Sequence, residues 1–270
     1  MSGMSWIRET AGQWIAVNRM SRAVALLHRF AFWVEQQYHN ESSDSATNGE
    51  YDLLQKLQCE DFRIVIDVGA NVGDWSVVAA QCWPSCRVHA FEIVPQIFAD
   101  LQETVKISAC QNITAVNNGL GNEQGKIQIH YYPEHPDLSC EGPRHNYHSI
   151  VVDATTKTLV DYCASAGIGI IDFLKIDVEG VEYKVLQGAS ALVDAGAIHC
   201  IQFEYGAFSL DTRFLLRDYY EMLGAGYWIG KIYPGYVDFR DYDWRMEDFR
   251  FCNYLCVSRS RPDLLDRLAL

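Results

Sequence analysis

The chain has 270 residues, of which 49% are hydrophobic and 13% are aromatic. A chain of this length and composition can bury a large core, which excludes a disordered protein, a collagen-like fibre and a disulfide-stapled mini-protein. It carries 22 Lys and Arg against 35 Asp and Glu, a formal net charge of −13. This balance disfavours a nucleic-acid partner, because phosphates attract a basic face.

The first 50 residues differ from the rest of the chain. Residues 1–34 are helix-friendly and carry four arginines and one acid, a charge of +3 within an acidic chain. On one helix, at about 100° per residue, the arginines would share roughly 80° of arc and leave most other faces apolar. We expect a helix that packs on the domain, contacts a second copy of the chain (a homo-oligomer) or lies at a membrane surface. Residues 40–50 are small, polar and acidic and indicate a linker, so we predict a helical extension and linker over 1–50 and a domain over 51–270.

From residue 51 onward, short apolar runs alternate with helix-compatible stretches. The runs predict strands at 63–69, 87–94, 113–118, 170–177 and 198–206, and the stretches predict helices at 73–82, 95–105, 156–164 and 181–194. Strands separated by helices form parallel sheets that bind ligands at the carboxyl ends of their strands. Two closely spaced runs around Pro234 and Gly235, followed by a run over 251–258, predict an antiparallel C-terminal edge. The predicted fold class is therefore α/β.

The first predicted strand ends in a tight turn into a helix. The sequence IVIDVGANVGDWS places Asp67 at the strand end and Gly69, Asn71 and Gly73 in the turn, where Gly and Asn tolerate a positive φ. The dinucleotide pattern G-x-G-x-x-G would need glycine where this chain has Asn71 and Asp74. An acid at the helix start disfavours a pyrophosphate beside it. The turn favours a nucleoside ligand without phosphates over NAD, although an ordinary strand–helix turn has a similar composition.

A carboxylate follows at the end of the second predicted strand. Glu92 lies 25 residues after Asp67. A carboxylate there can accept both hydroxyl protons of an unsubstituted ribose, although a solvated strand-end acid would look the same. The turn and Glu92 together predict binding of a nucleoside cofactor.

A second acidic group follows the fourth predicted strand, in FLKIDVEGVEYKVLQGA. Asp177 ends the strand, and Glu179 and Glu182 follow at the expected start of a helix, whose dipole stabilises carboxylates. Glu182 could equally be a first-turn charge without a chemical role. Asp177 lies level with Asp67 and Glu92, at the strand ends where such sheets bind ligands.

These motifs, with HAFEIVP and the strand that ends in Phe203 and Glu204, resemble the FkbM family of S-adenosylmethionine-dependent methyltransferases over about residues 62–257. The D-x-E-G-x-E block followed by V-L-x-G-A is the most specific part of the resemblance. It implies a Rossmann-like class I methyltransferase fold with seven strands, the last antiparallel. It also implies methyl transfer to oxygen, often a hydroxyl of a sugar or a natural product.

The resemblance further implies roles for individual residues. The residues that would bind the cofactor are Asp67, Gly69, Asn71 and Gly73 at the methionine part, Glu92 at the ribose and Asn118 beside the adenine. The residues that would lie where the methyl donor meets its acceptor are Asp177, Glu179 and Glu204.

A hydroxyl acceptor must lose its proton, so a base within hydrogen-bond reach is useful. The three carboxylates are candidates, and so is a histidine of the loop 131–149, which contains His135, His145 and His148. The loop could be a lid with His148 as the base, because histidine titrates near neutrality. It could also be a solvated surface loop. A zinc site is the third alternative, although the spacing matches no metal template. We expect no metal, with a divalent cation held by the three carboxylates as the alternative.

The sequence thus predicts an S-adenosylmethionine-dependent O-methyltransferase that acts on a hydroxyl of a small molecule, sugar or glycan. The alternatives are N-methylation, a non-catalytic protein that binds the cofactor, and a nicotinamide oxidoreductase, which Asn71 and Asp74 disfavour. No apolar run of about 20 residues and no signal-peptide pattern are visible, and the nine cysteines include no C-x-x-C pair. We therefore expect a cytoplasmic protein with free thiols.

Overall fold

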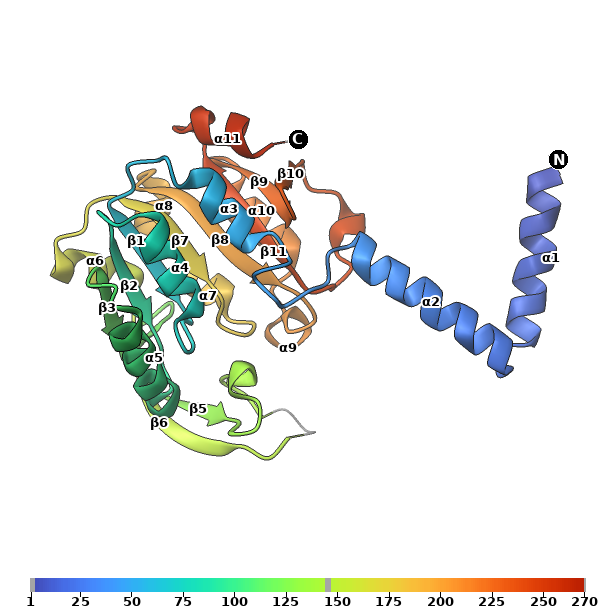
Figure 1. Cartoon of the computed structure of the whole chain (residues 1–270), viewed down its shortest axis with the longest axis horizontal. Coiled ribbons are helices and arrows are strands. Elements are labelled where there is room, and N and C mark those ends of the chain that lie inside the picture. Colours follow the sequence, from blue (N-terminus) through green and yellow to red (C-terminus); the bar gives the residue numbers. More distant parts are fainter. Residues whose placement is uncertain (1–2, 144–146, 270) are drawn as a thin grey trace. The chain divides into compact units, whose positions relative to one another are not determined.

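The computed structural model describes residues 3–143 and 147–269 (Figure 1). His145 of the expected lid therefore lies outside the described residues. The chain divides into two compact units, one up to Ser42 and one from Ser43 onward. Each unit is described by itself.

The first unit consists of two helices, α1 (Gly3–Val17) and α2 (Arg22–Tyr38). The Ser21 side chain caps α2 by accepting a hydrogen bond from the backbone N–H of Val24, 3.3 Å away. The break before Ser21 means that the arginines do not share one helix, so the single arc expected for them is wrong. Among the described helices, none combines the length and the apolar character that a membrane crossing requires.

An eight-stranded sheet forms the centre of the second unit, in the order β10-β9-β11-β8-β7-β1-β2-β3. Five neighbouring strands run parallel: β3 (Ile113–Val116), β2 (Arg87–Phe91), β1 (Ile64–Val68), β7 (Ile171–Ile176) and β8 (Ile198–Tyr205). Every residue of β1 and β7 is buried, because helices cover both faces of the sheet, as is usual for parallel strands.

The antiparallel strands lie at the other end of this sheet. Strand β11 (Cys252–Ser258) pairs antiparallel with both β8 and β9 (Tyr227–Tyr233), so the last strand of the sheet in the sequence lies inside it. Strand β10 (Tyr236–Phe239) forms the expected hairpin with β9 and adds an eighth strand at the edge. The predicted Rossmann-like class I methyltransferase fold, with its mostly parallel sheet and antiparallel C-terminal part, is confirmed.

Two apolar clusters, one on each face of the sheet, form most of the core. One cluster joins Ile64, Ile66 and Val68 of β1 to α6 (Leu159–Ala166), α7 (Glu182–Gln187), α8 (Ser190–Asp194) and α10 (Leu216–Leu223). The other joins Val65 to α3 (Glu50–Leu57), α4 (Asp74–Cys82) and α11 (Pro262–Leu268). Alternate residues of β1 thus serve opposite faces, as the two-residue period of a strand requires. Helix α5 (Pro95–Ser108) packs beside β3.

A second, three-stranded sheet in the order β4-β6-β5 was not predicted. It contains β4 (Gly119–Leu120), β5 (Gly125–Tyr131) and β6 (Ile150–Lys157), and the loop between β5 and β6 carries the short helix η1 (Pro136–Leu138). Because β6 extends to Lys157, α6 begins later than the expected 156–164 helix. The expected helix over 181–194 is interrupted at Gly188, where an added Cβ would lie 1.9 Å from the carbonyl oxygen of Gly121.

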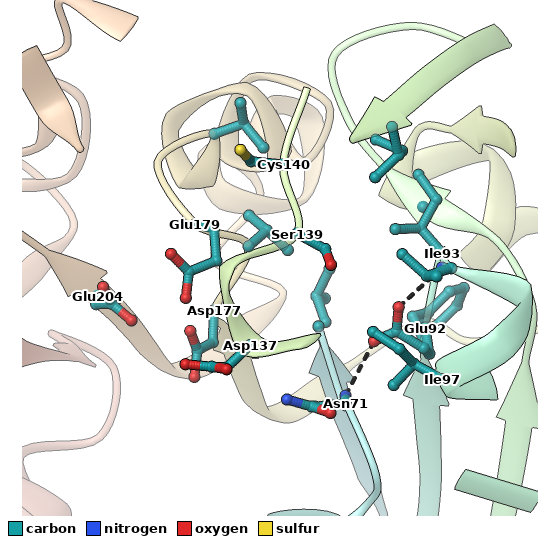
Figure 2. Close-up of a pocket in the computed structure, with 18 of the residues that line it drawn as sticks. Asn71, Glu92, Ile93, Ile97, Asp137, Ser139, Cys140, Asp177, Glu179 and Glu204 are labelled. Atoms are coloured by element: carbon teal, nitrogen blue, oxygen red, sulfur yellow. Dashed lines mark hydrogen bonds between the residues drawn. The ribbon is translucent and has the colours of Figure 1, made fainter. Parts of the chain in front are cut away.

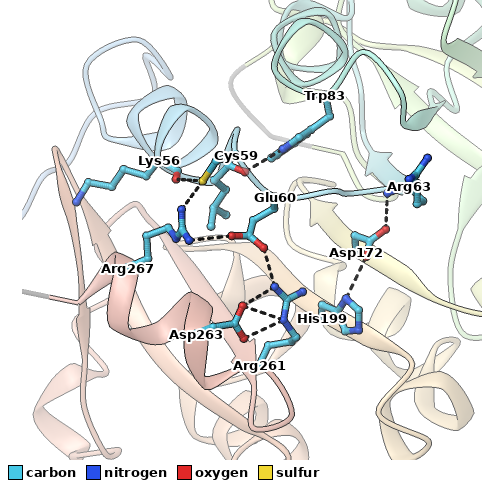
Figure 3. Close-up of polar contacts among 11 residues, drawn as sticks. Lys56, Cys59, Glu60, Arg63, Trp83, Asp172, His199, Arg261, Asp263 and Arg267 are labelled. Carbon is cyan, nitrogen blue, oxygen red and sulfur yellow. Dashed lines mark hydrogen bonds and ion pairs between the residues drawn. The ribbon is translucent and has the colours of Figure 1, made fainter.

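Polar contacts fix the amino ends of the parallel strands, opposite the edge where ligands bind in such sheets (Figure 3). The Asp172 carboxylate accepts from the backbone N–H groups of Arg63 and Ile64, at 2.7 and 2.9 Å, and lies 3.0 Å from His199 Nδ1. Arg261 of the segment before α11 pairs with Glu60 at 2.7 Å. The remaining short helices are α9 (Ser209–Thr212) and η2 (Trp244–Met246).

Candidate active site

The turn after β1 has the conformation that its sequence predicted. Gly69 and Asn71 have φ values of 82° and 49°, and Gly73 begins α4 with a φ of 95°. At Gly69 a Cβ would lie 1.7 Å from the Asp177 carbonyl oxygen, so only glycine lets β1 and β7 end side by side here. The backbone N–H of Gly69 donates to the Phe91 carbonyl at 3.0 Å, which joins the turn to β2.

Glu92 follows β2 directly and is only 6% exposed. Its carboxylate accepts from the backbone N–H groups of Asn71, at 3.0 Å, and Val94, at 2.8 Å (Figure 2). Burial raises the pKa of Glu92 to about 7, although these hydrogen bonds partly oppose the rise. Glu92 therefore titrates near neutral pH and holds the turn in place.

A cavity of about 270 Å³ opens over the carboxyl ends of the parallel strands. Ten residues were predicted for the site, and seven of them line this cavity: Gly69, Asn71, Glu92, Asn118, Asp177, Glu179 and Glu204. In Figure 2, Glu92 with Ile93 and Ile97 lies on one side of the cavity, and Asp177, Glu179 and Glu204 lie on the other. The fold thus brings together residues that are 135 positions apart in the sequence.

Asn118 has an unused hydrogen-bonding group at this cavity. Its Nδ2 donates to Thr155 Oγ1 at 2.8 Å, while its buried Oδ1 has no hydrogen-bond partner within the described residues. A buried amide oxygen without a partner is costly, so a donor on a ligand would stabilise it.

The acidic side of the cavity holds two carboxyl groups in contact. A hydrogen bond joins Asp177 and Glu204, and Lys175 Nζ lies 2.8 Å from Asp177 Oδ2. Lys175 lowers the pKa of Asp177 against the opposing effect of burial, whereas burial and the Asp177 charge raise the pKa of Glu204 far above its usual range. Asp177 is therefore the more acidic of the two groups.

Glu179 completes this group, and Glu182 has a different position. Ligand atoms of Asp177, Glu179 and Glu204 lie within 4.8 Å of one another, a spacing that would also suit a divalent cation. Glu179 has a φ of 60°, so its backbone adopts the left-handed conformation in the turn after β7. Glu182 accepts from the backbone N–H groups of Val178 and Gly180, both at 3.0 Å, and so holds this turn.

Asp67 and Gly73 lie next to the cavity without lining it. The Asp67 carboxylate is fully buried, accepts from Ser76 Oγ at 2.6 Å and lies 3.7 Å from Lys175 Nζ. Burial raises its pKa despite the lysine. Asp67 therefore faces the buried lysine rather than the open part of the cavity.

His148 is exposed and is not among the residues that line the cavity, so this structure gives no support to His148 as the base. His135 stacks edge-on against Tyr147. The same loop does cover the cavity, but with other residues, among them Asp137, Ser139 and Cys140 (Figure 2). These residues form no sequence motif, so the sequence alone could not have identified them as lining residues.

Residues 43–50, expected to be a linker, also line the cavity through Ser43, Ser45 and Glu50. Glu50 is buried, and its carboxylate accepts from Gln202 Nε2 at 2.6 Å and from Asn253 Nδ2 at 3.2 Å. Glu50 and Asn253 are 203 positions apart, so no local pattern could have paired them. This contact anchors the segment beside the acidic side of the cavity.

Comparison with known proteins identifies the family. The sequence model of the methyltransferase FkbM domain matches residues 67–239. The chain belongs to the FkbM methyltransferase family. The matched region contains all ten residues predicted for the site of this methyltransferase, whereas Glu50 and Asn253 lie outside it.

Several known proteins are similar to this FkbM methyltransferase. The 31-O-demethyl-FK506 methyltransferase FkbM of Streptomyces tacrolimicus is 30% identical over 46% of this chain and 58% of its own length. The hexuronic acid methyltransferase AglP of Haloferax volcanii is 25% identical over 63% of this chain and 69% of its own length. A solved structure of the O-methyltransferase TomG of Streptomyces achromogenes has a TM-score of 0.44 at 9% identity, over 81% of this chain and 82% of that one. The chain spans 59% of the length of the first two curated relatives it matches.

Proposed function

We propose that this FkbM methyltransferase uses S-adenosylmethionine to methylate a hydroxyl group of a small molecule, sugar or glycan. One observation carries the proposal: Glu92 and Asn118 line the same cavity as Asp177 and Glu204, which are joined by a hydrogen bond. The first pair suits a nucleoside, and the second suits the removal of a proton from an acceptor.

The residues at the β2 end of the cavity fit an adenosyl cofactor. The Glu92 carboxylate can accept hydrogen bonds from ribose hydroxyls beyond the two that it takes from the backbone. The unpartnered Oδ1 of Asn118 can accept from the adenine amino group. Ile97 and Leu120 supply apolar surface beside them.

The residues at the β7 and β8 ends fit a hydroxyl acceptor. When bound, S-adenosylmethionine supplies an electrophilic methyl group. Asp177 and Glu204 lie beside each other at the cavity, where a carboxylate can accept the proton that an acceptor hydroxyl loses. Lys175 holds Asp177 in place, and Glu179 adds a third carboxyl group within 4.8 Å.

Calorimetric titration and a turnover assay test the proposal. We expect S-adenosylmethionine and S-adenosylhomocysteine to bind and NAD not to bind. We also expect S-adenosylhomocysteine release with hydroxyl acceptors, and the same rate after EDTA treatment. Binding of NAD alone would overturn the cofactor assignment, and cofactor binding without turnover on any acceptor would indicate a non-catalytic protein. Loss of activity with EDTA would assign a cation to the three carboxylates.

We also propose a cytoplasmic location and a contact role for the first unit. All nine cysteines are free thiols, which supports a reducing compartment. On α2, the apolar side chains of Leu26, Phe30 and Trp33 are each more than half exposed, which supports contact with a membrane surface or with a second copy of the chain. We take the domain boundary to lie in the linker that ends at residue 50.

A further inference from the structure

The charged residues in the described lining of the cavity are all acidic. Seven of its residues carry a carboxyl group, and none of the lining residues that the structure describes is Lys, Arg or His. Apart from Glu92 at the β2 end, these carboxyl residues are Glu50, Asp137, Glu141, Asp177, Glu179 and Glu204.

Two lysines lie close to this lining, and both are paired with its carboxylates. Lys175 is 4% exposed, and its Nζ contacts Asp177 at 2.8 Å and Asp67 at 3.7 Å. Lys184 forms an ion pair with Glu141. Neither lysine therefore offers an uncommitted positive charge to an anionic group on a ligand.

The strand order places the acids on the acceptor side. Glu92 follows β2, Asp177 follows β7 and Glu204 belongs to β8, so the acidic side is separated from the ribose position by β1. Beyond Glu204, β11 contributes Asn253, and the segment before α3 contributes Ser43 and Ser45. The far side of the cavity thus offers hydroxyl and amide groups together with carboxyl groups, which suits a ligand with several hydroxyls.

We propose that the acceptor is a neutral or cationic molecule with several hydroxyl groups, and that the cavity rejects acceptors with a carboxylate or phosphate beside the reacting hydroxyl. This inference rests on the proposed methyl transfer. An acceptor hydroxyl within reach of Asp177 would bring a neighbouring anion close to Asp177 and Glu179. At about 5 Å and an effective dielectric constant of about 20, repulsion between two like charges corresponds to roughly a 100-fold loss of binding. The inference separates this chain from a relative named for a hexuronic acid, a sugar that carries a carboxylate.

Matched acceptor pairs test the proposal on the full chain. The pairs are alkyl glucosides and the corresponding glucuronides, with the methyl ester of each glucuronide as a neutral analogue of similar shape. We expect kcat/KM for the glucoside and the ester to exceed that for the glucuronide by about 100-fold. Equal or faster methylation of the glucuronide would overturn the proposal.

A substitution at the rim tests whether charge causes the discrimination. Ser43 is exposed and lines the cavity, whereas Ala46 is exposed in the same segment and does not line it. We expect Ser43→Arg to reduce the preference for the neutral acceptor at least tenfold and Ala46→Arg to leave it unchanged. An equal preference in the wild type and Ser43→Arg would contradict a charge-based mechanism.

A binding measurement keeps the inference testable if no sugar in the panel is methylated. In sinefungin a carbon that bears an amino group replaces the sulfur of S-adenosylhomocysteine, so the ligand places a positive charge beside the sulfur position, where the acids lie. We expect sinefungin to bind at least tenfold more tightly than S-adenosylhomocysteine, and Glu179→Gln to reduce this ratio. Equal affinities would overturn the acidic-cavity argument, whereas tighter sinefungin binding without turnover on any acceptor would contradict the proposed function alone.

Discussion

The titration of Glu92 gives a prediction that joins cofactor binding to pH. With a pKa of about 7, Glu92 is roughly 10% ionised at pH 6 and roughly 90% ionised at pH 8. Ribose hydroxyls donate hydrogen bonds, so they favour the ionised carboxylate. We expect S-adenosylhomocysteine to bind about tenfold more tightly at pH 8 than at pH 6, which corresponds to about 1.4 kcal/mol.

The substitution Glu92→Gln removes this titration while it keeps one acceptor oxygen. We expect weaker binding at pH 8, by roughly 1.5–3 kcal/mol for lost hydrogen bonds to a charged group, and a dissociation constant that no longer changes with pH. Glu123→Gln is the matched control, because Glu123 is exposed and does not line the cavity. Glu92→Ala is less clean: the sequence alone predicts intact folding, but the structure shows that Ala would leave the backbone N–H groups of Asn71 and Val94 without their acceptor.

Stability should move in the opposite direction with pH. The folded-state pKa of Glu92 lies above its ordinary value of 4.5, so its contribution is fully present below pH 4.5 and is lost as pH rises through about 7. The loss is at most about 3 kcal/mol for this group, and Glu92→Gln should remove it from the pH dependence of urea unfolding. For the binding prediction, calorimetric titrations with S-adenosylhomocysteine at four pH values would refute the reasoning if the dissociation constants of the wild type and Glu92→Gln changed equally with pH.

Three other substitutions and one deletion give separate tests. Glu179→Gln should lower turnover at least tenfold and leave the affinity for S-adenosylhomocysteine, which has no charge at its sulfur, within about twofold. His148→Ala should match the wild type in rate and pH profile, and the reverse pattern would restore the histidine as base. Lys175→Met should lower the free energy of unfolding by roughly 3–5 kcal/mol at pH 7, because the buried Asp67 and the partly exposed Asp177 both lose their partner, and a loss below 1 kcal/mol would contradict the ion pairs. Deletion of residues 1–42 should leave cofactor affinity unchanged but lower co-sedimentation with anionic liposomes or the particle mass in light scattering. If the two chains behave alike in both assays, the first unit has no contact role.

The sequence alone could predict the parts of the site that depend on local rules. Gly69 and Asn71 mark a turn with positive φ, and Glu92 and Asp177 end apolar runs that must be buried strands. Because parallel strands end at one edge of their sheet, the strand pattern already implied that these residues meet.

The parts that were missed depend on contacts between distant segments. The composition of residues 40–50 resembles a linker, and only the pairing of Glu50 with Gln202 and Asn253 anchors it at the cavity. The loop 131–149 contributes to the lining of the cavity through Asp137 and Ser139, whereas the chemistry of histidine pointed to His148. The second sheet was missed because β4 has only two residues and β6 was partly taken for a helix.

The division of the cavity between two sheets has a consequence for how acceptor preference can evolve. The floor belongs to the eight-stranded sheet, while Ile127, Ile129, Asp137, Ser139 and Thr156 belong to the β4-β6-β5 sheet or its loop. The two sheets share no strand, so insertions in the loop between β5 and β6 leave the register of the larger sheet intact. We therefore expect exchange of this loop between family members to change the lining of the cavity while the strand ends that carry Glu92, Asp177 and Glu204 stay in place.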